Sequence, residues 1–263
     1  MITTSQSPGD VQSPSEQFGC GAFRATLLSV LMPIYNERPT LAEIVHRVFR
    51  SPIPLETELI AVDDHSTDGS WELLLELAGI EPRIKPFRQP RNRGKGAAIR
   101  TALEHAGGEV AVVQDADLEY DPAIFGKLLS PILSGEADAV FGSRFTGLGD
   151  GAISPWNRWA NRFLTRITNR VTGLALSDME TGAKMIRTDF LRRLDLRCDT
   201  FSIEPELVCR LAQAGARIVE LPITYSGRGY GAGKKVRPPD FLKALATLVR
   251  CGVFDRRPPE RNS

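Results

Sequence analysis

The chain has 263 residues, of which 42% are hydrophobic and 25% charged, and its formal net charge is +1. These values are ordinary for a soluble globular protein, and such a balanced charge gives no argument for nucleic acid as a partner. No apolar run approaches the roughly 18 residues needed to cross a bilayer, and four cysteines without a C-x-x-C pair indicate reduced thiols in a cytosolic protein.

The two ends of the chain differ in composition from the rest. Residues 1–22 are polar, rich in Ser, Gln and Pro, and lack the apolar segment of a signal peptide. We expect residues 1–22 and 255–263 to be disordered. The remaining residues, 23–254, are enough for a single domain.

Apolar runs alternate with segments of helical spacing along the first part of this domain. The expected strands are 27–35, 58–64, 83–89, 109–117 and 137–145, and the expected helices are 39–50, 66–79, 94–108 and 121–133. Ser66, Thr67 or Asp68 is expected to cap the second helix. This alternation predicts an α/β fold with a mostly parallel sheet and helices on both faces.

The second part of the chain is less regular. We expect helices over 154–173 and near 201–215, a strand over 217–225, a loop over 226–240 and a final helix over 240–254 capped by Asp240. The first of these helices is amphipathic, with an arginine every four residues beside aromatic and aliphatic side chains: Arg158, Arg162, Arg166 and Arg170, and Trp156, Trp159, Phe163, Ile167 and Val171. Such a helix suits an anionic membrane surface, and a solvated basic face over an ordinary core is the alternative.

Three acids alternate directly after an apolar run in VVQDADLEY (112–120). If the strand continues, Asp115, Asp117 and Glu119 share one face. Mg²⁺ and Mn²⁺ prefer oxygen ligands, and Mg²⁺ is often held by one or two carboxylates together with substrate phosphates. The stretch is either a metal site or a solvated acidic loop, and its place at a strand end favours the metal site.

Other polar clusters also follow expected strands, where open α/β sheets bind their ligands. Asp63 and Asp64 end one strand and are suited to accept hydrogen bonds from a ribose or a base. RNRGKGAAIR (91–100) places Lys95 and two glycines at a helix N-terminus, which favours an anion; a solvated basic turn is the alternative. The basic, Gly-rich loop 226–240 is either a segment that closes over phosphates or an ordinary surface loop.

The motifs together resemble those of glycosyltransferase family 2 on the GT-A nucleotide-sugar-binding fold. The matching blocks are SVLMPIYNER, AVDDHSTDGS, NRGKGAAIR, VVQDADLEYDP, FGSRF, SDMETGAKMIR, FSIEPEL and ELPITYSGRGYGAGKKV. The later blocks are similar to the polyprenyl-phosphate hexosyltransferase branch, which includes the dolichol-phosphate mannosyltransferases. Ala183 and the segment VRPPD depart from the branch pattern, because both lack an aromatic that is usual there, and both bear on the acceptor site.

The resemblance implies a role for each matching position. The nucleotide sugar would be bound by residues from several strand ends and from the closing loop: Pro33, Tyr35, Glu37, Asp63, Asp64, Lys95, Asp115, Arg228, Tyr230, Lys234 and Lys235. Asp115 and Asp117 would bind Mg²⁺ or Mn²⁺, with Glu119 as a further ligand. Arg144 would meet the acceptor phosphate or the diphosphate, and Asp178 and Glu180 would face the sugar, so that Asp117, Arg144 and Asp178 form the expected catalytic set.

Three functions stay open on the sequence. The first is metal-dependent, inverting transfer of mannose or glucose from GDP-mannose or UDP-glucose to a polyprenyl phosphate, by a cytoplasmic protein peripheral to the cytosolic membrane face. Many relatives carry C-terminal transmembrane helices that this chain lacks, which suits branch members that rely on a membrane partner subunit. The second is a soluble transferase that glycosylates a sugar or small-molecule hydroxyl in cell-envelope glycan synthesis, with Asp178 as general base. The third is a non-catalytic sugar-nucleotide-binding or membrane-docking protein, against which the intact D-A-D argues.

Overall fold

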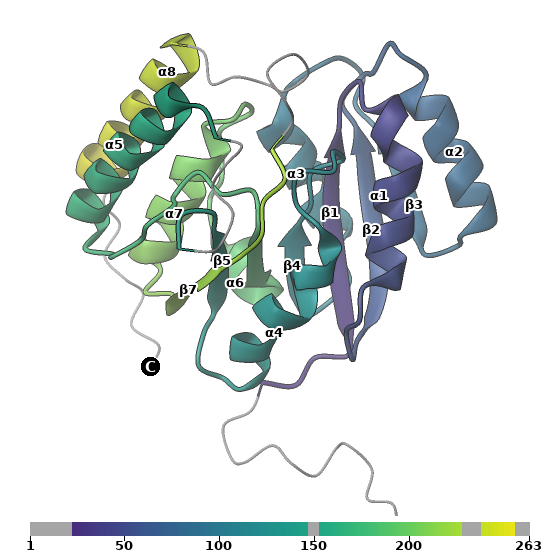
Figure 1. Ribbon diagram of the computed structural model, residues 1–263, viewed down its shortest axis with the longest axis horizontal. Coiled ribbons are helices and arrows are strands. Elements are labelled where there is room, and N and C mark those ends of the chain that lie inside the picture. The colour runs from purple at the N-terminus through teal and green to yellow at the C-terminus, as the bar shows by residue number, and fades with distance from the viewer. Residues whose placement is uncertain (1–22, 147–152, 228–237, 256–263) are drawn as a thin grey trace, which may run out of the picture.

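The structure is a computed structural model that describes residues 23–146, 153–227 and 238–255 (Figure 1). Its strands are β1 (Leu27–Ile34), β2 (Glu56–Asp63), β3 (Ile84–Arg88), β4 (Val110–Val113), β5 (Ala139–Ser143), β6 (Lys184–Arg187) and β7 (Ile218–Pro222). They form one sheet in the order β3-β2-β1-β4-β6-β5-β7. β6 runs antiparallel to β4 and β5, and all other neighbours are parallel, so the expected mostly parallel sheet is confirmed.

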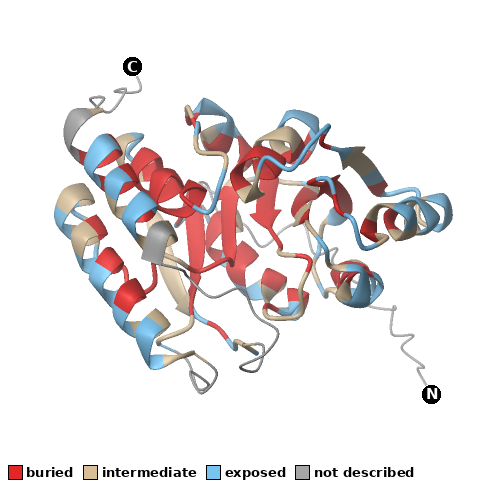
Figure 2. Cartoon of the chain, turned by 90° about the horizontal axis from the view of Figure 1, so that it is seen from above, coloured by how far each residue is buried: buried red, intermediate tan, exposed pale blue. Residues whose placement is uncertain are grey.

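Helices cover both faces of this sheet. They are α1 (Arg38–Arg50), α2 (Ser70–Ile80), α3 (Lys95–His105), α4 (Phe125–Leu133), α5 (Pro155–Thr172), α6 (Thr188–Arg193), α7 (Ile203–Gln213) and α8 (Pro238–Val249). Successive strand residues point to opposite faces, so Val112 joins the core under α1, α2 and α4, whereas Val113 joins the core under α3, α7 and α8. Figure 2 shows the buried strands in the centre, with the exposed sides of the helices turned outward.

The strand that precedes the acidic motif is shorter than expected. We expected it over 109–117, but β4 ends at Val113, so Asp115, Asp117 and Glu119 lie in a loop and strand alternation does not place them. The cause is Gln114, whose Nε2 donates to the carbonyl oxygens of Asp115 and Tyr120, both at 3.1 Å. These bonds turn the chain back on itself, and the strand's ladder of backbone hydrogen bonds does not continue through the motif.

Two expected helix caps are wrong. α2 begins only at Ser70, after Gly69 with φ = +89°, and the expected caps Ser66 and Thr67 instead bond to the loop after β1. Asp68 still accepts the N–H of Ser70 at 3.0 Å. Asp240 lies in the first turn of α8, which begins at Pro238.

The second part of the chain also differs in detail from the sequence expectation. α6 was not expected, and a short π-helical turn, Arg250–Phe254, follows α8. None of the helices in the described ranges combines the length and apolarity that a membrane span requires. The cysteines within those ranges, Cys198, Cys209 and Cys251, are free thiols.

Candidate active site

The predicted site residues within the described part of the chain lie at the carboxyl edge of the parallel strands. β2, β4 and β5 lead into Asp64, Asp115 and Arg144 at this edge. Because β6 is antiparallel, its amino end lies there too, with Lys184 paired in register to Val113 of β4. Residues 178–183, which precede β6, therefore enter the site between β4 and β5.

A chain of alternating charges runs through this edge. Nζ of Lys95 lies 2.9 Å from Oδ1 of Asp115 and 3.0 Å from Oε1 of Glu204. The other oxygen of Glu204 binds Nζ of Lys184, whose side chain is 1% exposed. Burial by itself would raise the pKa of Glu204, but Lys184 and Lys95 outweigh it and lower that pKa to about 2. Lys95 is therefore held as a cation beside the first acid of the D-A-D motif, because buried charges persist when they are paired.

The three acids of the motif have different partners. Asp115 is paired with Lys95. Oδ1 of Asp117 accepts the N–H of Glu119 at 3.1 Å, and Oε2 of Glu119 accepts the hydroxyl of Tyr225 at 2.7 Å. The described residues contain no group of three or more His, Cys, Asp or Glu side chains arranged to hold a metal ion.

Asp115 and Asp117 nevertheless fit a divalent cation that takes its other ligands from a substrate. Mg²⁺ is commonly bound through one or two carboxylates plus phosphate oxygens, so a complete protein cage is not needed. A Cβ at Gly182 would lie 2.9 Å from Oδ2 of Asp115, so the absence of a side chain there keeps this carboxylate clear. Glu119 is the weaker ligand because it already holds Tyr225.

The chain at the start of the basic loop is hydrogen-bonded to the acidic motif. Besides the bond between Tyr225 and Glu119, the N–H of Ser226 donates to the carbonyl of Glu119 at 3.1 Å. The predicted loop residues Arg228, Tyr230, Lys234 and Lys235 lie outside the described part of the chain.

The two aspartates after β2 have different environments. Asp63 is 0% exposed; its Oδ2 binds the N–H of Ser66 and Nε of Arg88, whereas Oδ1 has no hydrogen-bond partner among the described residues. A buried, unpaired acceptor calls for a ligand or water to complete it. Asp64 instead accepts the backbone N–H groups of Arg93 and Gly94, at 2.8 and 2.7 Å, and so fixes the loop before α3.

The remaining predicted nucleoside residues come from β1 and the loop after it. Pro33 and Tyr35 are half-buried. Oε2 of Glu37 accepts the Thr40 hydroxyl at 3.1 Å, and this hydroxyl also lies 2.9 Å from the carbonyl oxygen of Ala116. Glu37 is thereby brought next to the D-A-D loop.

The N-terminus of α3 is in contact with another part of the chain, which takes up part of the backbone expected to bind an anion. The N–H of Ala97 donates to the carbonyl of Asp199 at 3.0 Å. A Cβ at Gly96 would lie 2.1 Å from the carbonyl oxygen of Cys198, and one at Gly94 2.6 Å from that of Asp199. The two glycines therefore allow a close backbone contact, and the Lys95 side chain of this motif reaches Asp115 at the acidic edge.

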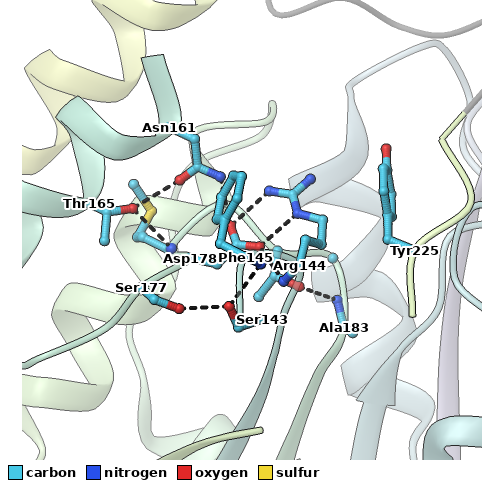
Figure 3. A network of polar contacts seen from close by, with 12 residues as sticks. Ser143, Arg144, Phe145, Asn161, Thr165, Ser177, Asp178, Ala183 and Tyr225 are labelled. Carbon is cyan, nitrogen blue, oxygen red and sulfur yellow. Dashed lines mark hydrogen bonds and ion pairs between the residues drawn. The ribbon is translucent and has the colours of Figure 1, made fainter. Parts of the chain in front are cut away.

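Arg144 and Asp178 form a buried bidentate ion pair (Figure 3). Nε and Nη2 of Arg144 donate to the two oxygens of Asp178 at 2.7 and 2.8 Å, and the backbone N–H of Arg144 donates at 3.0 Å. Asn161 donates to the same carboxylate at 2.6 Å. Asp178 is 0% exposed and surrounded by donors, so it suits the fixing of Arg144 better than proton abstraction; the general-base role stays a prediction.

Glu180 is a second acid of this block with an unusual environment. Its Oε1 is buried and has no hydrogen-bond partner among the residues described. Burial raises the pKa of Glu180 to about 7, with a further contribution from Glu204. A carboxyl that titrates near neutrality can donate or accept a hydrogen bond, so it suits the predicted place beside a sugar hydroxyl.

Four aromatic side chains and a leucine form an apolar surface on α5 and α8, exposed except for the partly buried Phe241, which we call the α5–α8 surface: Trp156, Trp159, Phe163, Phe241 and Leu242. Trp156 and Trp159 are 49% and 52% exposed, and Leu242 is 62% exposed. The ring centroids of Trp156 and Trp159 lie 5.3 Å apart, those of Trp159 and Phe163 5.5 Å, and those of Phe163 and Phe241 5.8 Å. Contiguous exposed apolar surface of this kind marks a contact with another molecule or with a membrane.

Several residues that complete these contacts were missed from the sequence: Tyr120, Asn161, Lys184, Glu204, Glu220 and Tyr225. Lys184 and Glu204 lie in blocks already singled out, where a charge among apolar neighbours was the available signal, since such residues are rarely buried unless paired. Asn161 and Glu220 lie in regular elements, and no local pattern distinguishes them.

The sequence of the chain is similar to those of known proteins. The family model described as Glycosyl transferase family 2 matches residues 29–195. The chain is 30% identical over 238 residues to a dolichol-phosphate mannosyltransferase of Pyrococcus furiosus, covering 87% of this chain and 66% of that protein. It is 30% identical over 235 residues to a polyprenol monophosphomannose synthase of Mycolicibacterium smegmatis, covering 86% of this chain and 87% of the relative.

Solved structures share the fold. A glucosyl-3-phosphoglycerate synthase from Mycobacterium tuberculosis, in complex with Mn²⁺, UDP and phosphoglyceric acid, superposes with a TM-score of 0.67 at 20% identity, covering 87% of this chain and 79% of that chain. S. aureus TarS 1-349 in complex with UDP-GlcNAc superposes with a TM-score of 0.60 at 20% identity, covering 86% and 66% of the two chains.

Proposed function

The chain belongs to glycosyl transferase family 2 and has the GT-A fold, and we propose that it transfers a hexose from a nucleotide sugar to a polyprenyl phosphate at a membrane surface. The names of its relatives support this acceptor and favour mannose as the sugar. The catalytic centre is the carboxyl edge of the sheet, with the donor bound by residues after β1, β2 and β4 and the acceptor by Arg144.

The observation that carries the proposal is the pair of Arg144 and Asp178. A hydroxyl acceptor needs a base to take its proton, but the buried Asp178 already accepts two side-chain bonds from Arg144 and one from Asn161. A phosphate acceptor is already anionic and needs no base. It needs a fixed cation, and Arg144 provides one in a part of the protein where its side chain is 13% exposed.

The donor side of the site supplies charge for the leaving group. Asp115 and Asp117 would hold Mg²⁺ or Mn²⁺, which, when bound, neutralises charge on the nucleoside diphosphate. Lys95 adds a fixed positive charge beside Asp115. We assign the unpaired Oδ1 of Asp63 to the base or ribose of the nucleotide, and Arg228, Lys234 and Lys235 to the closure of the loop over the diphosphate. Attack on the face opposite the leaving group gives inversion.

The function is tested with a panel of labelled nucleotide sugars that includes GDP-mannose and UDP-glucose. Each is incubated with the protein, Mn²⁺ and a membrane lipid extract, and the products are partitioned between lipid and water. We expect the label in the lipid fraction, in a product from which mild acid releases the labelled sugar. Label found only in a water-soluble product would contradict a polyprenyl-phosphate acceptor and favour the soluble hydroxyl transferase.

Membrane attachment is expected to depend on the α5–α8 surface. Helix α5 carries arginines as well as three of the aromatic rings of this surface, and interfacial aromatic side chains with basic neighbours suit an anionic bilayer. Replacing Arg158, Arg162 and Arg166 with Gln should remove roughly 3 kcal/mol, because each basic residue near such a surface contributes about 1 kcal/mol. The affinity for anionic vesicles, measured by co-sedimentation, should then fall on the order of 100-fold.

A matched triple variant controls for the loss of charge alone. Arg83, Arg193 and Arg197 are exposed, lie outside α5 and α8, and are each paired with a neighbouring acid. Replacing them with Gln should leave vesicle binding close to that of the unaltered protein. Equal binding by both triple variants would refute the docking role of α5.

A further inference from the structure

Asp178, which holds Arg144, is itself held from two other elements, one at its backbone and one at its carboxylate. Oε1 of Glu220, on β7, accepts the backbone N–H of Asp178 at 3.0 Å. From α5, Nδ2 of Asn161 donates to Oδ1 of Asp178 at 2.6 Å (Figure 3). Asn161 is only 6% exposed, so this bond is formed away from water.

The orientation of the Asn161 amide follows from its neighbour one turn along α5. The hydroxyl of Thr165 accepts the N–H of Met179 at 3.2 Å, and its own proton is then directed to Oδ1 of Asn161, 2.9 Å away. An amide whose oxygen accepts there presents its NH₂ group to Asp178. Each group in the series of hydrogen bonds from Met179 to Asp178 therefore has a fixed role as donor or acceptor.

These bonds define the plane of the Asp178 carboxylate. The terminal torsion of an aspartate is broad, so the carboxylate turns easily unless donors fix it. The backbone N–H of Arg144 binds Oδ2, and Asn161 binds Oδ1, so each oxygen has a donor outside the guanidinium. The bidentate bonds of Arg144 need both oxygens in the plane of the guanidinium.

We propose that Asn161 is a positioning residue of the acceptor site, which fixes the plane of Asp178 and thereby the direction in which Arg144 meets the acceptor phosphate. The phosphate in this statement rests on the proposed function, but the positioning of Arg144 does not. The outer side of the same helix carries Trp156, Trp159 and Phe163. One helix thus links the surface assigned to lipid with the arginine assigned to the lipid's phosphate.

Three isosteric variants of α5 test the inference. Asn161→Leu keeps the shape and removes the donor, and Thr165→Val removes the hydroxyl that orients the amide. Thr168→Val is the matched control, because Thr168 is equally buried but its hydroxyl donates only to the carbonyl of Leu164 within the helix. Thr165→Ser keeps the hydroxyl and should behave as the unaltered protein.

The first measurement does not require transfer activity. Hydrogen exchange of the Nε–Hε group of Arg144 is followed by NMR in ¹⁵N-arginine-labelled protein, with Arg144→Lys used for assignment. We expect exchange to be about tenfold faster in Asn161→Leu, less accelerated in Thr165→Val, and unchanged in Thr168→Val. Unchanged exchange in both Asn161→Leu and Thr165→Val would overturn the inference.

The second measurement addresses the reaction. With a short-chain polyprenyl phosphate in detergent micelles, Asn161→Leu should raise the KM for the phosphate about tenfold and leave the KM for the nucleotide sugar unchanged. An equal change in both constants, or none, would overturn the acceptor-site role. If the unaltered protein glycosylates no polyprenyl phosphate, the proposed function fails, whereas the exchange of Arg144 still decides whether Asn161 positions it.

Discussion

Asp117→Asn is expected to lower kcat about 1,000-fold while the fold survives. The substitution removes one negative charge from the proposed cation site, and loss of a group that stabilises charge in the transition state typically costs about 100- to 1,000-fold. The amide oxygen of Asn can still accept the N–H of Glu119, which Asp117 accepts at 3.1 Å, so the loop keeps its local bond. Initial rates over a series of Mn²⁺ concentrations, with circular dichroism as a check of the fold, measure the effect.

Asp121→Asn is the matched control in the same loop. Asp121 also accepts the N–H of the residue two positions on, that of Ala123, at 2.9 Å. Its other contact is an exposed ion pair with Arg47, of a kind that contributes at most about 1 kcal/mol. We expect its kcat to stay within a factor of two. Full activity of Asp117→Asn at every Mn²⁺ concentration would remove Asp117 from the metal site.

Arg144→Met should have the second large effect, on both stability and activity. It leaves the buried carboxylate of Asp178 without its cation, and breaking a buried ion pair in this way costs about 3–5 kcal/mol of unfolding free energy. Transfer should be lost because the acceptor phosphate loses its partner. Urea unfolding and steady-state rates measure the two effects separately.

The double variant Arg144→Met/Asp178→Asn separates the two effects. Neutralising Asp178 removes the unpaired charge, so most of the unfolding free energy should return, while transfer stays absent. Arg217→Met is a control at the opposite ends of the strands, just before β5 and β7. There Asp138 loses one arginine but keeps Arg187. It should lose less stability than Arg144→Met and keep its kcat. Recovery of transfer in the double variant would show that Arg144 has only a structural role.

The sequence predicted those features that depend on neighbours in the chain. The spacing of apolar residues gave α1, α3, α5 and most strands to within a few residues, because a 3.6-residue or two-residue period reflects one buried face. It failed where a side-chain bond or a distant contact replaces the regular pattern. After β4 ends at Val113, the Gln114 side chain bonds to the carbonyl of Tyr120 six residues on, and the start of α3 is contacted by Asp199 from a distant part of the chain.

The same distinction holds for the candidate site. The D-A-D motif and the aspartates after β2 were found because they follow apolar runs. Lys95 was found too, but its pairing was not, because its partner Glu204 lies 109 positions away in the chain and meets it only in the folded protein. Asn161 carries no local signal at all, since its role depends on the turn of α5 that faces Asp178. The predicted roles of Arg228, Lys234 and Lys235 stay predictions.

The reversed direction of β6 has a consequence for how this enzyme can diverge. Most residues that we assign to the donor come from the stretch that ends with the D-A-D motif, whereas the arginine that we assign to the acceptor and its supports come from later segments. Of these, residues 178–183 enter beside β4 because β6 is antiparallel. The loop residues Arg228, Lys234 and Lys235, which we assign to the diphosphate, are the exception, and the ion pair of Lys95 and Glu204 joins the two parts of the chain. We therefore expect substitutions around Arg144 and Asn161 to change the choice of acceptor more than the binding of the nucleotide sugar.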